Sequence, residues 1–224
     1  ASATFGLIPL FSIPALENGV GLDSLLFYRF SLASVLVAVL MWVKKIPFDI
    51  QKSEFGTAFI LGTLYAITAL WLTEAYLYIP SGVATTIHFL YPVVVSLINV
   101  CILQGQADNA DTAGNGDGGK RCLYVERRKY AGRSINIKGL MLVLATVIAY
   151  AAYIVGMNRS RIARLDSLKA TFYILLSGAI VFLVNLAIKG DFPDPMPNLA
   201  TTIDVLMVAF LPTLVSDLTL ILAI

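Results

Sequence analysis

Charged residues are scarce in this sequence, where Lys, Arg, Asp and Glu together make up 13% of the 224 residues. A soluble domain carries about 25% charged residues, and a soluble chain of this length could not hide the 58% that are hydrophobic. Two cysteines exclude a disulfide framework, and a net charge of +2 is too small to indicate nucleic-acid binding. There is one histidine, and no catalytic triad or metal-ligand cluster can be recognised. We therefore expect no enzymatic activity and no cofactor.

Long hydrophobic runs dominate the chain instead. A membrane-spanning helix needs about 20 mainly apolar residues, and helices pair every backbone polar group within their own segment. The sequence predicts an all-α integral membrane protein with seven readable spans, at 3–16, 24–43, 55–79, 83–103, 139–157, 170–188 and 200–224. Pro92 is expected to kink the fourth span. The first span is short, and both ends of the chain are expected to be truncated.

The charges of the connecting loops predict an orientation in the membrane. The loop at 43–54 carries three lysines, and the loop at 158–169 carries three arginines and a lysine. Acidic residues outnumber basic ones in the loops at 17–23 and 189–199. By the positive-inside rule the first two loops are cytoplasmic and the other two are external.

The segment at 104–135 conflicts with this orientation. Two cytoplasmic loops must be separated by an even number of crossings, yet three spans lie between them. Residues 104–119 are polar and glycine-rich and residues 120–133 are basic, so the segment cannot span a bilayer as written. Two hypotheses stay open: a one-base frameshift across 115–127, which would permit an apolar half-span, or a genuine cytoplasmic loop.

A short internal repeat relates the two halves of the chain. The sequence LDSL at 22–25 recurs at 165–168, and each copy opens a span. The first copy follows an external loop and the second a cytoplasmic loop, so the two halves have opposite orientations. Inverted repeats are a common plan of secondary transporters. Inversion requires an odd number of helices in each half, which again requires a fifth span before residue 139.

Three motifs stand in the order typical of one transporter family. They are GLDSL with an Arg-Phe pair at 21–30, AYLYIPSGVA at 75–84, and a Tyr-Pro pair at 91–92. In these motifs the chain resembles the EamA-type branch of the drug/metabolite transporter superfamily.

The resemblance implies a ten-helix transporter fold of two inverted five-helix repeats. Residues 1–103 would hold helices 1–4 of the first repeat, 104–135 would stand in place of helix 5, and 136–224 would hold helices 6–8 of a truncated second repeat.

The same resemblance implies a secondary transporter. It would move a small metabolite or drug-like solute across the bacterial cytoplasmic membrane by alternating access, coupled to ions or protons. Its expected partners are the solute and the lipid bilayer but no nucleic acid, and a homodimer is left open. A membrane-embedded enzyme or assembly factor, and an inactive frameshifted gene fragment, stay open as alternatives.

Ionisable groups inside spans are costly and are therefore functional candidates. Arg29 could anchor an anionic group, Glu74 could bind a proton or cation, and His88 could relay protons. The kink at Pro92 frees a backbone carbonyl. The aromatic candidates for a cavity lining are Tyr91, Tyr150, Tyr153 and Tyr173, and Tyr65 and Trp71 are further aromatic residues of the spans that could line it. The structural alternatives are snorkelling for Arg29, an interfacial carboxylate for Glu74, an interhelical hydrogen bond for His88, and ordinary packing for the tyrosines.

Among the glycines of the predicted spans are Gly56, Gly62, Gly156 and Gly178. Glycine lets two membrane helices approach until their backbones are in contact. We expect these glycines to serve helix packing rather than chemistry.

Overall fold

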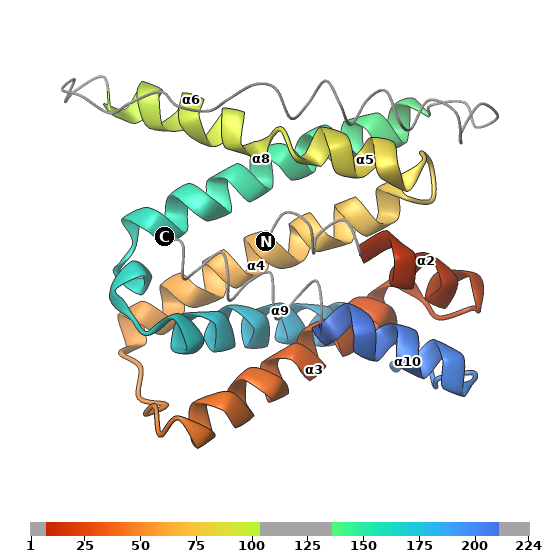
Figure 1. The fold of residues 1–224 in the computed structure, drawn as a ribbon, viewed down its shortest axis with the longest axis horizontal. Coiled ribbons are helices and arrows are strands. Elements are labelled where there is room, and N and C mark those ends of the chain that lie inside the picture. The colour runs from red at the N-terminus through yellow and green to blue at the C-terminus, as the bar shows by residue number, and fades with distance from the viewer. Residues whose placement is uncertain (1–7, 104–135, 211–224) are drawn as a thin grey trace.

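The computed structural model describes residues 8–103 and 136–210, and this part of the chain is a bundle of helices without a β-strand (Figure 1). In chain order the elements are α2 (Ile8–Glu17), α3 (Leu22–Val43), α4 (Lys52–Ala75), α5 (Ser81–His88), α6 (Tyr91–Leu103), α8 (Ile137–Arg159), the 3₁₀ turn η1 (Arg161–Arg164), α9 (Ser167–Lys189) and α10 (Leu199–Val208). The prediction of an all-α chain is confirmed.

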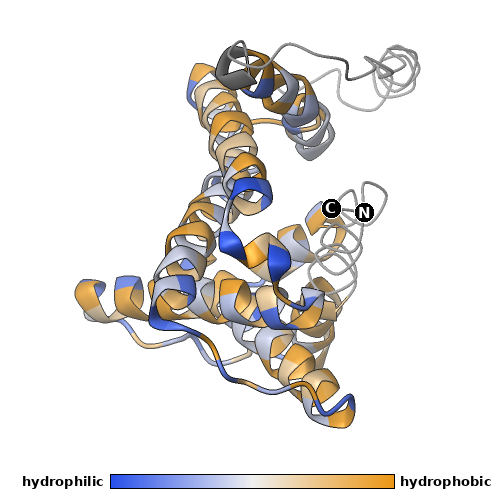
Figure 2. Ribbon diagram, turned by 90° about the vertical axis from the view of Figure 1, so that its left-hand side faces the viewer, coloured by the Kyte–Doolittle hydropathy of each residue, from blue (hydrophilic) through white to orange (hydrophobic). Residues whose placement is uncertain are grey.

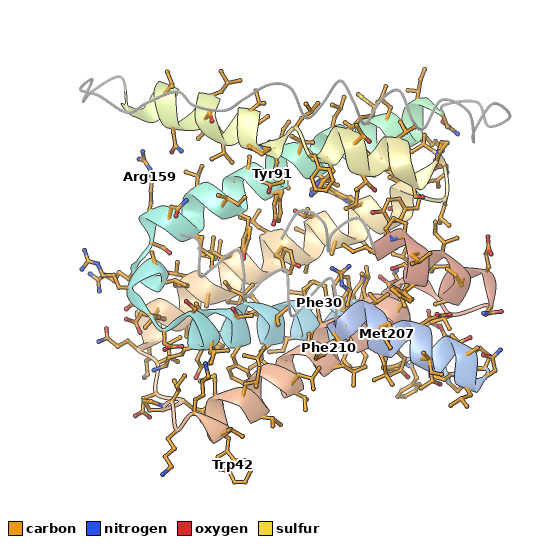
Figure 3. The ribbon with its side chains drawn as sticks, viewed as in Figure 1. Phe30, Trp42, Tyr91, Arg159, Met207 and Phe210 are labelled. Atoms are coloured by element: carbon orange, nitrogen blue, oxygen red, sulfur yellow. The ribbon has the colours of Figure 1, made fainter. Side chains whose placement is uncertain are left out.

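Within the described ranges, five segments are long and apolar enough to cross a bilayer, with α5 and α6 counted together. Apolar residues cover the outer faces of these helices as well as their inner ones (Figure 2). Trp42 is 76% exposed and Ile188 is 79% exposed, and Figure 3 shows Trp42 pointing away from the bundle. An outer surface of this kind fits hydrocarbon rather than water, which confirms the prediction of a membrane protein.

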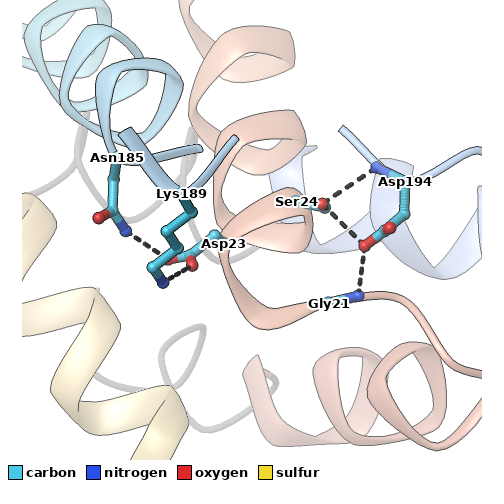
Figure 4. Close-up of polar contacts among 6 residues, drawn as sticks. All are labelled: Gly21, Asp23, Ser24, Asn185, Lys189 and Asp194. Carbon is cyan, nitrogen blue, oxygen red and sulfur yellow. Dashed lines mark hydrogen bonds and ion pairs between the residues drawn. The ribbon is translucent and has the colours of Figure 1, made fainter. Parts of the chain in front are cut away.

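The two LDSL copies begin their helices differently. In the second copy, Asp166 is the N-cap of α9 and accepts a hydrogen bond from the Leu168 N–H at 2.9 Å. In the first copy, Asp23 lies inside the first turn of α3 and interacts with α9 instead: it accepts from the Asn185 amide at 2.8 Å and forms an ion pair with Lys189 (Figure 4). The aspartate of the LDSL sequence therefore caps a helix in the second half and forms an interhelical contact in the first half.

The packing of the helices has the symmetry of an inverted repeat. α3 and α9 pack against each other, and the start of each helix lies near the end of the other, so they are antiparallel. α4 packs against α8 and α9, and α10 packs against α2 and α3. Exchanging α2 with α8, α3 with α9 and α4 with α10 maps these five contacts onto one another.

The four charged loops meet in pairs, as their charges predicted. At one end, here called the acidic end, the loops at 17–23 and 189–199 are in contact. There Asp194 Oδ2 accepts hydrogen bonds from the Gly21 N–H at 2.8 Å and the Ser24 hydroxyl at 2.9 Å (Figure 4). At the opposite, basic end, the Tyr173 hydroxyl at the start of α9 donates to the Phe48 carbonyl in the loop at 43–54. Which end faces the cytoplasm stays a prediction.

The fourth predicted span is broken, as expected from its proline. α5 ends at His88 and α6 begins at Tyr91, so Pro92 lies in the first turn of α6, where its missing N–H costs no helical hydrogen bond. α6 and α8 run in the same direction, because α6 ends at the basic end and α8 begins at the acidic end (Figure 1). This agrees with the parity argument, which found one crossing too few. The frameshift hypothesis itself concerns 104–135 and lies outside the described residues.

Candidate functional site

A small buried cavity lies where α2, α3, α4, α5 and α8 meet. Its volume is about 10 Å³, which is room for roughly one water molecule. Its lining residues are Ile8, Arg29, Tyr65, Thr68, Ala69, Leu72, Thr73, His88 and Tyr150. The cavity therefore combines a cation, an imidazole and hydroxyl groups inside an otherwise apolar bundle, and a solute larger than water needs the surrounding helices to separate.

Arg29 is the only charged residue among the described residues that line this cavity. Its side chain is 2% exposed, and its guanidinium carbon lies 5.8 Å from the centre of the Phe30 ring. Protein atoms rather than the membrane surface surround it, so snorkelling does not describe this side chain. Its burial inside the bundle and its place in the cavity lining make Arg29 the strongest single candidate for solute binding.

Tyr76 lies just beyond the end of α4, near the same cation. Tyr76 is buried within the bundle. A phenol of this kind stays neutral at physiological pH. Tyr76 therefore adds a polar but uncharged group beside Arg29.

His88 is held by α8 through a hydrogen bond that also determines its tautomer. Its Nδ1 lies 3.0 Å from the Thr146 hydroxyl, and that hydroxyl lies 2.6 Å from the Val143 carbonyl. Thr146 has one proton and a carbonyl can only accept, so the hydroxyl donates to Val143 and accepts from His88. A neutral His88 consequently carries its proton on Nδ1 and keeps Nε2 as a hydrogen-bond acceptor.

Aromatic rings form a continuous cluster around the cavity. The Tyr65 and Tyr153 rings are stacked with centres 5.3 Å apart, and the Tyr91 ring meets Tyr150 edge-on at 4.7 Å. The His88 ring lies 5.2 Å from that of Tyr150. Figure 3 shows Tyr91 reaching from the start of α6 into this region. Offset and edge-on pairs are the favourable geometries for such rings, so the cluster joins α4, α5, α6 and α8 into one wall.

The predicted site residues are distributed unevenly over the fold. Arg29, His88 and Tyr150 line the cavity, and Tyr153 and Tyr91 form the ring layer next to it. Three others lie elsewhere: Glu74 is half-buried and absent from the lining, Pro92 is exposed, and Tyr173 contacts Phe48 and Phe55 near the basic end. The roles of all eight stay predictions.

Five residues of α4 line the cavity: Tyr65, Thr68, Ala69, Leu72 and Thr73. Sequence reasoning names only Tyr65 of these, as one of several aromatic residues that could line a cavity, and it does not select the other four. Their spacing of three and four residues places them on one face of a helix. The signal was a stripe of hydroxyl groups within a span, but threonine is too common in such helices for the stripe to be distinctive. Thr146, which holds His88, was missed for the same reason.

Replacing Thr146 by valine is expected to lower the free energy of unfolding by about 1–2 kcal/mol more than replacing Thr171 by valine. Both hydroxyls are buried and bind a carbonyl of their own helix, but Thr146 alone also accepts from His88. Removing it leaves a buried donor unsatisfied. Denaturant or thermal unfolding of the purified protein in detergent measures the difference. Equal losses in the two variants would contradict the assigned hydrogen bond.

No group of three or more His, Cys, Asp or Glu side chains that could hold a metal ion occurs in the part of the chain that the structure describes.

Comparison with known proteins agrees with the helical architecture. A model of the EamA-like transporter family matches residues 1–116. One solved structure, titled "Crystal structure of protein", is similar to this chain with a TM-score of 0.72 and 16% sequence identity, covering 98% of this chain and 77% of the other. At that identity the likeness concerns the fold. No curated protein matches the chain.

Proposed function

The chain belongs to the EamA-like transporter family, and from this premise we propose that it is a secondary transporter that moves a small solute by alternating access. The family is one of membrane transporters rather than enzymes. We place the protein in the cytoplasmic membrane with its basic end inside. An ion or proton gradient supplies the energy, because the sequence holds no recognisable nucleotide-binding segment.

The observation that carries the proposal is a pair of equivalent tyrosine contacts at opposite ends of the bundle. Near the start of α3, the Tyr28 hydroxyl donates to the Asp194 carbonyl at 3.0 Å. Near the start of α9, the Tyr173 hydroxyl donates to the Phe48 carbonyl. In each case the tyrosine of one repeat holds the loop that follows the second helix of the other repeat. Exchanging the two repeats therefore replaces the contact at the acidic end by the contact at the basic end, and the reverse.

Such a pair supports alternating access because the buried cavity lies between the two ends. A solute can enter only if one end opens, and the gradient is preserved only if the other stays closed. Two contacts of similar strength give two open states of similar free energy. The inverted repeat supplies this balance directly, because the same local structure is used twice in opposite orientations.

Replacing either tyrosine by phenylalanine is expected to bias the protein toward opening at the end of that tyrosine. A lost hydrogen bond of about 1 kcal/mol shifts a two-state equilibrium by about fivefold. A Thr68→Cys variant in which Cys101 and Cys122 are replaced by serine carries a single thiol, in the lining of the cavity. The rate at which a membrane-impermeant maleimide labels this thiol measures how accessible the cavity is from each side of the membrane. In vesicles of known orientation, Tyr28→Phe is expected to speed labelling from the acidic end and Tyr173→Phe from the basic end.

Tyr78→Phe is the matched control, because Tyr78 lies in the turn that follows α4 and its hydroxyl has no partner among the described residues. Its labelling rates should equal those of the parent protein from both sides. If both tyrosine variants speed labelling from the same side, or neither changes it, alternating access through these contacts is wrong.

A further inference from the structure

An apolar groove runs between α4 and α9 on the outer surface of the bundle. Its volume is about 310 Å³, which lies within the range of about 300–1,000 Å³ that small-molecule sites occupy. Three residues of α4 and five of α9 line it: Ala66, Ile67, Leu70, Val181, Phe182, Val184, Asn185 and Ile188. Unlike the buried cavity, the groove is large enough to hold a ligand without any movement of the helices.

The groove faces the lipid rather than the buried cavity. Val184 is 49% exposed and Ile188 is 79% exposed. Among the described residues, none lines both the groove and the buried cavity, because the two sets lie on different faces of α4. A ligand therefore reaches the groove from the hydrocarbon of the bilayer.

The groove extends over one leaflet of the bilayer. Its α9 lining runs from Val181 to Ile188, which is about 10 Å along the helix axis, and α9 ends with Lys189 at the acidic end. One leaflet of hydrocarbon is about 15 Å thick. The groove therefore begins near the headgroups of that leaflet and ends before the middle of the bilayer, as the acyl chain of a single lipid does.

Two opposite charges lie at the headgroup end of the groove. A Cβ on Gly62 of α4 would meet Ile174 of α9, and both helices run from the basic end to the acidic end. Counting along both helices from this contact places Glu74 level with the last turn of α9, which carries Lys189. Glu74 also follows Leu70 by one turn, so it lies on the side of α4 that lines the groove.

Both charges can bind a ligand. The Glu74 carboxylate is half-buried and has no hydrogen bond or ion pair within the described part of the chain. The Lys189 side chain is 51% exposed and forms an ion pair with Asp23 (Figure 4), but an ammonium has further N–H donors. A headgroup that carries both an ammonium and a phosphate complements this pair of charges.

We propose that the groove binds an aminophospholipid, a lipid whose headgroup carries a primary ammonium and a phosphate. One acyl chain lies between α4 and α9, the ammonium binds Glu74 and the phosphate binds Lys189. A quaternary ammonium lacks the N–H donors for Glu74, and an anionic lipid without an ammonium leaves Glu74 unpaired. The binding is a property of the folded chain and does not depend on the proposed transport.

Three phospholipids with the same acyl chains separate these features: phosphatidylethanolamine, phosphatidylcholine and phosphatidylglycerol. Each is added to the purified full chain in detergent, and thermal unfolding reports its binding. Phosphatidylethanolamine is expected to raise the unfolding temperature at a concentration about fivefold lower than either of the others requires. Equal responses to the three lipids, or no response to any, would overturn the proposal.

Glu74→Gln tests the headgroup contact. It is expected to remove the preference for phosphatidylethanolamine over phosphatidylglycerol, because the ammonium loses its carboxylate partner. Glu17→Gln is the matched control, since Glu17 is an exposed carboxylate at the acidic end that does not line the groove. The control is expected to keep the full preference. A preference that survives Glu74→Gln, or is lost in both variants, would reject the contact.

Val184→Phe tests the acyl-chain contact, because it fills the groove without changing a charge. It is expected to weaken binding of phosphatidylethanolamine by about fivefold. Leu183→Phe is the matched control, since Leu183 is 47% exposed on the same helix but does not line the groove. Equal effects of the two variants would contradict the proposal. So would native mass spectrometry that shows a lipid-free dimer which Val184→Phe dissociates, because a second copy would then occupy the groove.

Discussion

Replacing Gly62 by alanine is expected to lower the free energy of unfolding by about 2–3 kcal/mol, although the change adds a single methyl group. A Cβ at this position would lie 2.6 Å from the Ile174 carbonyl oxygen and 2.6 Å from the Ser177 Cβ. Both atoms belong to α9 and cannot rotate away as the tip of a long side chain could. α4 and α9 would have to separate, with loss of the packing along their shared face.

The measurement is denaturant or thermal unfolding of the purified protein in detergent, together with the amount of folded protein in the membrane. Gly56→Ala on the same helix is the control, because nothing lies within 4 Å of a Cβ built there. It is expected to be neutral or to stabilise α4 by up to about 1 kcal/mol, since alanine is the better helix former. Equal stability of the two variants would show that α4 and α9 are not in backbone contact at Gly62.

Replacing Arg29 by methionine is expected to reduce transport of the solute by about ten- to a hundredfold while the protein still folds. Hydrogen bonds to a charged group contribute about 1.5–3 kcal/mol, which corresponds to about ten- to a hundredfold in affinity. Methionine fills much of the space of the arginine stem and brings no charge into the bundle. Replacing a buried charge by an apolar residue of similar size is often neutral or stabilising.

The combination of retained stability and lost transport separates a binding role from a structural one. Uptake into proteoliposomes and unfolding in detergent should be measured on the same preparation. Arg159→Met is the matched control, because Arg159 is exposed in the last turn of α8 and points away from the bundle (Figure 3). If Arg29→Met lowers stability and transport in proportion, or transports normally, Arg29 does not bind the solute.

Part of the candidate site followed from residue type alone. Arg29 and His88 stood out because charged or titratable groups are expensive within a span, and both line the cavity. Glu74 has the same property, yet it is half-buried and does not line the cavity. The free-energy cost of a charge within a span identifies candidate functional residues, but it does not tell which face of the helix they occupy.

The glycines show that residue type also does not tell which residues of a span face a neighbouring helix. A Cβ at Gly62, Gly156 or Gly178 would come within 2.8 Å of a neighbouring helix, whereas Gly56 faces open space. All four were predicted to permit close packing, and the structure confirms three of them. Lys52 and Glu54 lie within four residues of Gly56, whereas no charged residue lies that close to Gly62 or Gly178. The polar surroundings of Gly56 were therefore a signal in the sequence that it lies at the edge of its span.

By itself, the sequence determined five of the seven predicted membrane spans, the pairing of the loops by charge and the break before Pro92, and it predicted an inverted relation of the two halves. These properties depend on local hydropathy, loop charge and short repeats, which act within one segment or on its orientation in the bilayer. Only the tertiary structure decided that His88 binds Thr146 and that α4 lines the cavity beside Arg29. The rotation of each helix about its own axis is set by side-chain packing against distant segments, and when spans are apolar on every face, hydrophobic periodicity cannot predict it.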